Sequence, residues 1–310
     1  DHRDLHSVPT RRSSDLLDEK QTAPLATKAL DKIFQHHYAG DTEEAITTRE
    51  LIDHLGQGLD EKARQLVRKL HSYTQSLENP AGWLARQEQL FRQDEPDSWR
   101  EWFLAAFPGW RAQWRAALAP HAEVPAIAQC LRELEAGDGV RTCPEAATLM
   151  AGLQRALDDK NNWPKGTKTP VKTRLARFWS DIDFLHAALA AEDGSDPLAQ
   201  DWQWVRQHLC ALLRLTREFG AVFSREKREQ GGVDFADLEQ CALRVLRDPA
   251  TGELTDIARQ WQRRLRFIFV DEYQDINPAQ DAILAALSRE GSEPNRFLVG
   301  GGKQSIYRCR

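Results

Sequence analysis

The 310-residue sequence lacks the features of several protein classes. No run approaches the roughly 18 consecutive apolar residues that a membrane-spanning helix needs, so we expect no membrane partner. The N-terminal segment is polar and charged, and it has no apolar stretch typical of a secretory signal. Cysteine is scarce: the five residues are scattered, and none forms a C-x-x-C pair. This pattern argues against a disulfide framework or a zinc site and favours reduced thiols in the cytoplasm.

The sequence also lacks a G-x-x-x-x-G-K-[ST] loop, so nothing in it is expected to cradle the α- and β-phosphates of a nucleotide. The segment 300–305 is superficially similar but lacks the spacing of the first glycine. The formal net charge of −5 neither predicts nor excludes a nucleic-acid partner, because a groove that grips DNA needs only local basic residues.

Most of the chain has helical patterning. From about residue 23 to residue 262, apolar residues recur at the spacing of amphipathic helices, so the protein is expected to be mostly α-helical. Glycine, proline and asparagine indicate breaks between helices of ordinary length. These breaks lie at 39–41, 79–80, 107–109, 136–139, 162–166 and 193–197.

Tryptophan and basic residues each admit two interpretations. The ten tryptophans lie in amphipathic segments, which favours packing in the core or between helices over stacking on nucleic-acid bases. The basic stretch between Lys160 and Arg177 is interpreted as a solvated face, with contact to duplex phosphates as the alternative.

The last part of the chain changes character. Asp234 is a good N-cap, with Asp237 three residues on, for a helix that ends near Leu246. After a further helix, two short apolar strands are predicted at 266–270 and 296–299, with a helix from about 278 to 288 between them. This β-α-β order predicts a parallel pair of strands with a right-handed crossover.

Two adjacent carboxylates, Asp271 and Glu272, directly follow the first of these strands. In phosphoryl transfer to water, a protein mainly positions groups and neutralises charge. Asp271 is therefore the candidate ligand of Mg²⁺, held through water, and Glu272 the candidate base that polarises the attacking water. Gln274, in the turn that follows, is a candidate contact of the phosphate site. Gln304, beyond the second strand, is expected to reach the terminal phosphate of ATP.

An acidic pair after a strand is weak evidence alone, but two motifs occur in the right order. The segment VDEYQDINPAQ resembles motif II of the UvrD-like superfamily 1 helicases, and GGGKQSIYRCR resembles their motif III. GGVDFADLEQCALRVL resembles the segment of the family shortly before motif II. Within that group the sequence of these motifs is most similar to that of AddA, the helicase–nuclease subunit of bacterial double-strand-break repair, with RecB a near relative.

The resemblance implies an α/β P-loop NTPase (RecA-like) fold with a large all-helical inserted subdomain, mostly α overall. Residues 17–230 would form the helical accessory subdomain of the first motor domain, and 231–310 part of the first RecA-like domain with motifs II and III. Tyr307 matches an aromatic that packs against single-stranded bases. Arg308 and Arg310 belong to the DNA-facing end of motif III.

The same resemblance matches Asp271 to the Mg²⁺-binding aspartate, Glu272 to the catalytic base and Gln304 to the glutamine that couples the γ-phosphate to DNA. Two positions depart from the pattern. The family usually has aspartate where this chain has Gly301, and an aromatic where it has Cys309. These departures are expected to weaken the coupling between the ATP site and DNA.

The leading hypothesis is a fragment of an AddA-like, ATP-dependent 3′-to-5′ DNA helicase–nuclease subunit in double-strand-break repair, with ATP and Mg²⁺ as cofactors. Its expected partners are DNA ends, single- or double-stranded, and an AddB-like subunit. Residues 1–16 lack periodicity and are interpreted as non-native, adaptor-derived or disordered. Without the phosphate loop and the second motor domain, the fragment alone is expected to be inactive. The alternatives are a plain UvrD- or RecB-type helicase fragment, and a non-catalytic helical binding module with a degenerate motor remnant.

Overall fold

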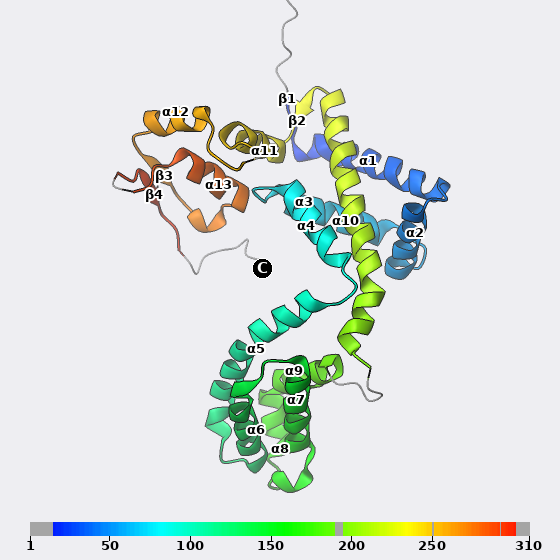
Figure 1. Ribbon diagram of the computed structural model, residues 1–310, viewed down its shortest axis with the longest axis vertical. Coiled ribbons are helices and arrows are strands. Elements are labelled where there is room, and N and C mark those ends of the chain that lie inside the picture. Colours follow the sequence, from blue (N-terminus) through cyan, green and yellow to red (C-terminus); the bar gives the residue numbers. More distant parts are fainter. Residues whose placement is uncertain (1–14, 190–194, 250, 292, 302–310) are drawn as a thin grey trace, which may run out of the picture. The chain divides into compact units, whose positions relative to one another are not determined.

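The computed structural model describes residues 15–189, 195–249, 251–291 and 293–301, and it is mostly helical (Figure 1). The described residues form two compact units. One holds the residues before Leu90 and after Gln207, and the other holds Leu90–Gln207. The longer helices in chain order are α1 (Glu19–Ala39), α2 (Glu43–Gly56), α3 (Glu61–Gln75), α4 (Pro80–Phe91), α5 (Asp97–Leu118), α6 (Pro125–Ala136), α7 (Cys143–Asp158), α8 (Lys168–Arg174), α9 (Ala176–Leu189), α10 (Pro197–Glu229), α11 (Phe235–Leu246), α12 (Asp256–Arg264) and α13 (Pro278–Leu287).

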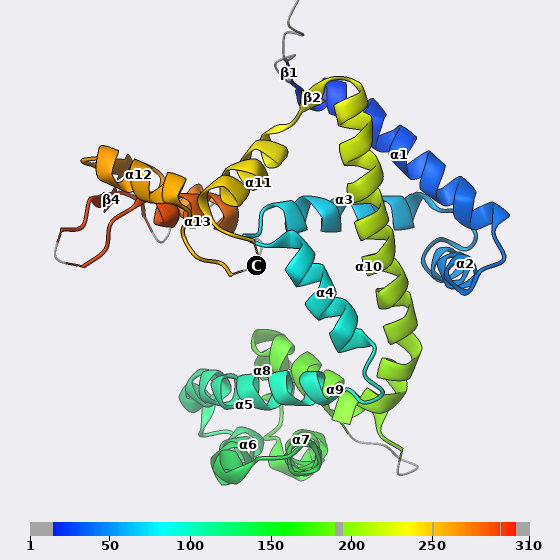
Figure 2. The ribbon, with the colours of Figure 1, turned by 45° about the horizontal axis from the view of Figure 1, so that its top comes forward.

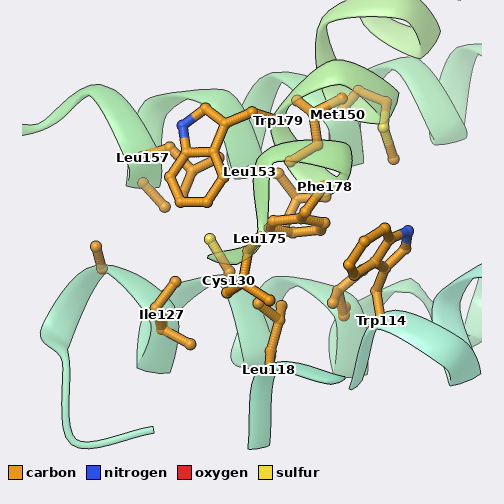
Figure 3. Close-up of a cluster of buried hydrophobic side chains, with 14 of the residues drawn as sticks. Trp114, Leu118, Ile127, Cys130, Met150, Leu153, Leu157, Leu175, Phe178 and Trp179 are labelled. Atoms are coloured by element: carbon orange, nitrogen blue, oxygen red, sulfur yellow. The ribbon is translucent and has the colours of Figure 1, made fainter. Parts of the chain in front are cut away.

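The unit of residues Leu90–Gln207 is a helical bundle around one hydrophobic core. Helices α5, α6, α7 and α9 contribute Trp114, Ile127, Met150 and Phe178, which all lie inside the cluster (Figure 3). The indole N–H groups of Trp110 and Trp114 both donate to Asp181 Oδ2, at 3.0 Å each. Such bonds satisfy the polar end of a tryptophan whose ring is packed in the core. Tryptophan thus serves this unit mainly as packing.

The predicted helix break at 107–109 is wrong, because α5 runs without interruption from Asp97 to Leu118 with Pro108 inside it. Proline removes one backbone hydrogen bond and normally kinks or ends a helix. Here Phe107 and Trp114 are buried on the core side of α5, so tertiary packing on both sides of Pro108 holds the helix together. The breaks at 39–41, 79–80 and 136–139 are confirmed by the end of α1, the start of α4 and the end of α6.

In the other unit, α1, α2 and α3 pack with α10 around a second core. Leu30 and Phe34 of α1, Val67 of α3, and Leu215 and Phe219 of α10 are almost fully buried there. The apolar faces of these helices supply most of the driving force for this packing, since each buried large side chain contributes about 1.5–3 kcal/mol.

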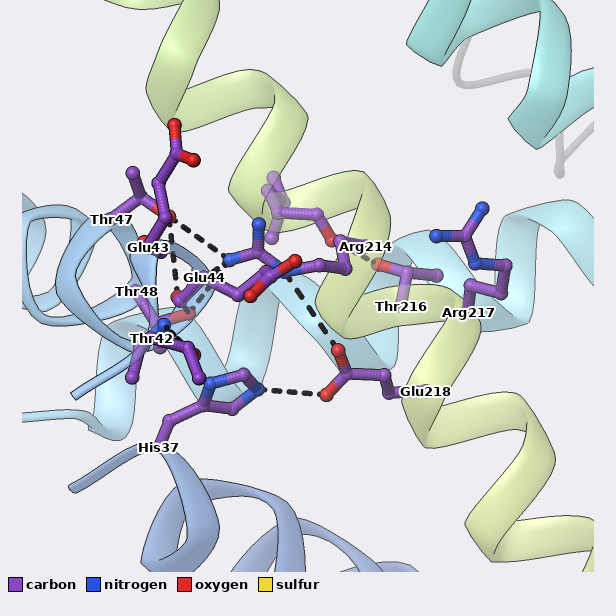
Figure 4. Close-up of polar contacts among 12 residues, drawn as sticks. His37, Thr42, Glu43, Glu44, Thr47, Thr48, Arg214, Thr216, Arg217 and Glu218 are labelled. Carbon is purple, nitrogen blue, oxygen red and sulfur yellow. Dashed lines mark hydrogen bonds and ion pairs between the residues drawn. The ribbon is translucent and has the colours of Figure 1, made fainter. Parts of the chain in front are cut away.

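Charged side chains connect α10 to the two N-terminal helices. Glu226, whose side chain is only 1% exposed, accepts from Lys28 at 2.7 Å and also from Lys32. Arg214 donates to the carbonyl oxygen of Glu44 at 2.8 Å (Figure 4). Glu218 Oε2 lies 2.8 Å from His37 Nε2 on the same face. These contacts fix the register of α10 against α1 and α2.

Two short parallel pairs of strands complete this unit. Strand β1 (Asp15–Leu16) pairs with β2 (Gly232–Val233), so the last two residues of the segment assigned to 1–16 take part in the fold. Residues 1–14 lie outside the described residues. Strands β3 (Ile268–Val270) and β4 (Arg296–Leu298) pair with each other in parallel. Helix α13 lies between them in the sequence, which confirms the predicted β-α-β order.

A small hydrophobic cluster joins α11, α12 and α13 beside β3 and β4. The strand pair carries exposed aromatic rings: Phe269 is 75% exposed and stacks on Phe297 at 5.2 Å between ring centroids. The division of the chain at residue 230 into an accessory subdomain and a motor-domain part stays a prediction.

Candidate nucleotide-hydrolysis site

The candidate site lies where β3 and β4 end. The register pairs Val270 with Leu298, so the loops that follow both strands leave the same edge of the sheet. Two backbone hydrogen bonds continue the pairing beyond the strands: Val299 N–H donates to Val270 O at 2.8 Å, and Tyr273 N–H donates to Val299 O at 2.9 Å. The residues after β3 are therefore held against those after β4.

Asp271 and Glu272 are both exposed at this edge. The backbone N–H of Glu272 donates to Asp271 Oδ1 at 2.9 Å, which fixes the aspartate side chain against the turn. Glu272 itself has φ 50° and ψ 40°, in the left-handed region. A non-glycine residue there is uncommon and costs about 1–3 kcal/mol, and such strain clusters at functional sites.

Gln274 connects the two loops. Its Oε1 accepts the backbone N–H of Gly301 at 3.0 Å, and its Nε2 donates to the carboxylate of Glu272. Gly300 makes this approach possible, because a Cβ at that position would lie 2.3 Å from Gln274 Oε1 and 3.1 Å from the backbone nitrogen of Tyr273. A side chain at position 300 would therefore displace the Gln274 amide from its contact with Gly301.

Tyr273 connects the turn after β3 to α13. The hydroxyl of Tyr273 donates to Asp281 Oδ1 at 2.9 Å, and this hydrogen bond, with some burial, raises the pKa of Tyr273. Asp281 also lies 3.7 Å from Arg296 at the start of β4. One aspartate of α13 therefore contacts residues of both strand segments.

The start of α13 is tied to α11 by contacts that the sequence analysis missed. Asn277 and Gln280 form a capping box at the N-terminus of α13. Both side chains also donate to the carboxylate of Glu239 on α11, at 3.1 and 2.7 Å. The Asn-Pro-x-Gln pattern at 277–280 is a capping signal that the sequence does contain. The partner on α11 has no such local signal.

The donor groups at this edge suit Mg²⁺, which binds in phosphate-transferring proteins through one or two carboxylates together with waters and substrate phosphates. Asp271 and Glu272 provide such carboxylates. Among the described residues, no group of three or more His, Cys, Asp or Glu side chains forms an all-protein metal site. The other predicted residues, Gln304, Tyr307, Arg308 and Arg310, lie outside the described residues.

Comparison with known proteins agrees with these motifs. The family model of the UvrD/REP helicase N-terminal domain matches residues 135–310, and the chain belongs to this family. The match covers α10, α11, both strands of the candidate site and the segment beyond them.

The chain is also similar to curated AddA proteins, which are named as subunits of an ATP-dependent helicase/nuclease. The protein from Moorella thermoacetica is 29% identical over 95% of this chain and 23% of its own length. The protein from Clostridioides difficile is 23% identical over 94% of this chain and 25% of its own length. That from Exiguobacterium sibiricum is 39% identical over 45% of this chain and 12% of its own length. The alignments with the first two of these proteins include almost all of this chain, yet the chain spans only about a quarter of the length of either protein.

The predicted absence of a membrane-spanning segment can be compared with the helices themselves. Within residues 15–189, 195–249, 251–291 and 293–301, no helix is both long and apolar enough to cross a membrane.

Proposed function

We propose that the chain is a segment of the first motor domain of an AddA-like, ATP-dependent 3′-to-5′ DNA helicase that acts in double-strand-break repair. The observation that carries the proposal is the junction of the loops after β3 and β4 through Gln274. The names of the similar proteins support an AddA-like parent over a plain UvrD- or RecB-type helicase. By the same analogy we propose an AddB-like subunit and DNA ends as the partners of the parent protein, and the cytoplasm as its location.

In this proposal, residues 17–230 form an accessory subdomain inserted in a RecA-like domain, of which 231–310 is a part. Asp271 holds Mg²⁺ through water, and Glu272 polarises the water that attacks the γ-phosphate of ATP. The ion supplies charge neutralisation at the phosphates. Gln274 positions the Glu272 carboxylate and ties it to the loop after β4. Gln304, Tyr307, Arg308 and Arg310 extend the site toward the γ-phosphate and the DNA strand.

The test is DNA-stimulated ATP hydrolysis by a protein that carries this chain together with a phosphate loop and a second motor domain. Glu272→Gln keeps the shape of the side chain but removes the base, so kcat should fall by about 10²-fold or more with little change in KM. Glu290→Gln, at an exposed glutamate outside the site, is the matched control and should keep the activity. Equal rates for the two variants would refute the role of Glu272.

A non-catalytic helical binding module is the second candidate, because the chain has glycine at position 301, where the family it resembles usually has aspartate. Both proposals expect the 310-residue chain alone to lack ATP turnover. They differ in the larger protein: the binding-module proposal expects wild type and Glu272→Gln to be equally inactive there.

A further inference from the structure

A cleft of about 1050 Å³ lies in the unit that contains α10 and α11, and neither Asp271 nor Glu272 lines it. Residues at the start of α4, in the last turns of α10 and along α11 line it. Figure 2 shows these three helices. The volume is at the upper end of the range for small-molecule pockets, so the cleft has room for more than a single small ligand. Of the residues that line it, only Pro278, at the start of α13, belongs to the motifs after β3 and β4.

The floor of the cleft is held by a buried amide. Gln240 on α11 is 8% exposed, and its Nε2 donates to the carbonyl oxygens of Gln75 at 2.9 Å and Leu77 at 2.8 Å. Ala279 N–H donates to Ser76 O at 2.9 Å. The C-terminal end of α3 is therefore fixed to α11 and α13, and the cleft is formed before any ligand enters.

Four arginines from three helices and the end of α11 line the cleft: Arg86, Arg228, Arg244 and Arg247. Arg247 lies 3.4 Å from Glu78. The other three are exposed, and none of them forms an ion pair with a described residue. Three guanidinium groups thus face this cleft without a carboxylate to neutralise them.

The acidic residues of the lining are already engaged. Asp237 lies 2.6 Å from the buried Lys227, and Asp248 accepts the backbone N–H of Thr251 at 3.1 Å. Glu78 is the partner of Arg247. The lining thus holds four arginines against three carboxylates, two of which pair with Arg247 and Lys227. This excess of positive charge favours an anion, although the chain as a whole carries a formal charge of −5.

Apolar and aromatic residues also line the cleft. Trp83 of α4 lines the cleft, and its ring meets Tyr73 edge-on at 5.5 Å between centroids. Leu77, Pro80 and Val233 lie along the same walls. Planar guanidinium groups match phosphate oxygens, and an indole offers a face on which any base can stack. An acidic peptide would use the arginines but has no comparable use for Trp83.

We propose that this cleft binds a single strand of DNA, with Arg86, Arg228 and Arg244 on backbone phosphates and Trp83 against a base. The inference rests on the proposed function for the identity of the nucleic acid. It adds a second contact region, on the helices before motif II, to the residues that follow β4.

The test is binding of a fluorescently labelled oligothymidylate to the 310-residue chain, followed by anisotropy over a range of salt concentrations without nucleotide. The variant carries Arg86→Ala, Arg228→Ala and Arg244→Ala together. Each phosphate contact on a single strand contributes about 0.7 to the slope of log K against log salt. The triple variant should therefore lose about 2 units of slope and bind at least about tenfold more weakly at low salt.

The matched control replaces three exposed arginines outside the cleft by alanine: Arg132, Arg225 and Arg263. It has the same net charge as the cleft variant and should keep the wild-type slope. A triple Arg→Lys variant of the cleft should also keep it, because lysine retains the charge. Circular dichroism of all variants checks that they fold alike.

Three outcomes would overturn the proposal: no binding of the strand by the wild-type chain, an equal loss in the control and cleft variants, or displacement of the strand by polyglutamate as effectively as by unlabelled strand. The last outcome would assign the cleft to an acidic polypeptide. Because this assay contains no ATP, its failure leaves the result of the Glu272→Gln experiment standing, and the two proposals fail separately.

Discussion

His71 on α3 should make the stability of this fold sensitive to mild acid. Its ring packs edge-on against Phe219 at 4.9 Å and Phe223 at 6.0 Å between centroids, both on α10. Burial, followed by the positive charge of Lys227, lowers the pKa of His71 to about 4. The carboxylates of Asp234 and Asp237 act in the opposite direction but do not compensate.

The sign and size of the effect follow from linkage. The folded pKa of about 4 is below the unfolded value of 6.5, so the fold favours the neutral ring. The stabilisation is complete above pH 6.5 and is lost as the pH falls toward 4. For these two values, linkage gives a loss of about 2 kcal/mol in the free energy of unfolding between pH 7.5 and pH 5.

The assay is urea unfolding followed by circular dichroism at both pH values, for the wild-type chain and for His71→Gln. The variant has no ring to protonate, so it should lack this part of the pH dependence. The stability difference between the two proteins should therefore narrow by about 2 kcal/mol on going to pH 5. The pH window stays above the range in which carboxylates ordinarily become protonated.

His36→Gln is the matched control, because His36 is an exposed histidine of α1. It should keep the full pH dependence of the wild type. The assignment of the pH dependence to the buried ring would be refuted if the free energy of unfolding changed equally with pH in the wild type and in His71→Gln. It would also be refuted if His36→Gln lost the same part of the pH dependence as His71→Gln.

Two further predictions concern the unit of Leu90–Gln207 and the surface of α11. Burial raises the pKa of the Cys130 thiol to about 12, so an alkylating reagent at pH 8 should leave it unmodified in the native protein. The exposed Cys241 should react, and mass spectrometry of the two peptides checks this; rapid labelling of Cys130 would contradict it. Gly137→Ala would place a Cβ 2.2 Å from Leu149 Cδ1 in the core and should cost about 1–3 kcal/mol in urea unfolding. Gly139→Ala meets nothing within 4 Å, and an equal loss there would argue against a steric cause.

The C-terminal elements were predictable because their signals are local. Strands β3 and β4 fall within the predicted 266–270 and 296–299, and α13 ends one residue before the predicted limit. Asp234 is the N-cap of α11 as predicted, and Asp237 completes a capping box with it. Apolar runs bounded by breakers, and caps within one turn of a helix start, need no information from distant residues.

The buried faces of the helices were less predictable. Leu66 and Tyr73 follow helical spacing on α3, yet they are 37% and 51% exposed, while Ala63 and Val67 are fully buried. Likewise Trp102 and Trp204 are more than half exposed, which the assignment of all ten tryptophans to packing did not anticipate. Periodicity indicates a helix, but which of two apolar stripes meets the core depends on the helices that pack against it.

In the candidate site, motif order placed Asp271 and Glu272 at a strand end, but it did not give the contact between Gln274 and Gly301. That contact joins residues 27 positions apart and depends on the path of both loops. The glycines at 300–302 were a partial signal, because a run of glycine often marks a close backbone approach.

The Gln274 amide joins two groups of opposite hydrogen-bonding type. It has one accepting end, taken by the Gly301 N–H, and one donating end, taken by the Glu272 carboxylate. A protonated Glu272 would be a poorer acceptor, and a shift of the segment after β4 would withdraw the N–H. The position of the Gln274 side chain therefore depends both on the ionisation state of Glu272 and on the position of the segment after β4. A change at Glu272 or in that segment is transmitted to the other through this one side chain.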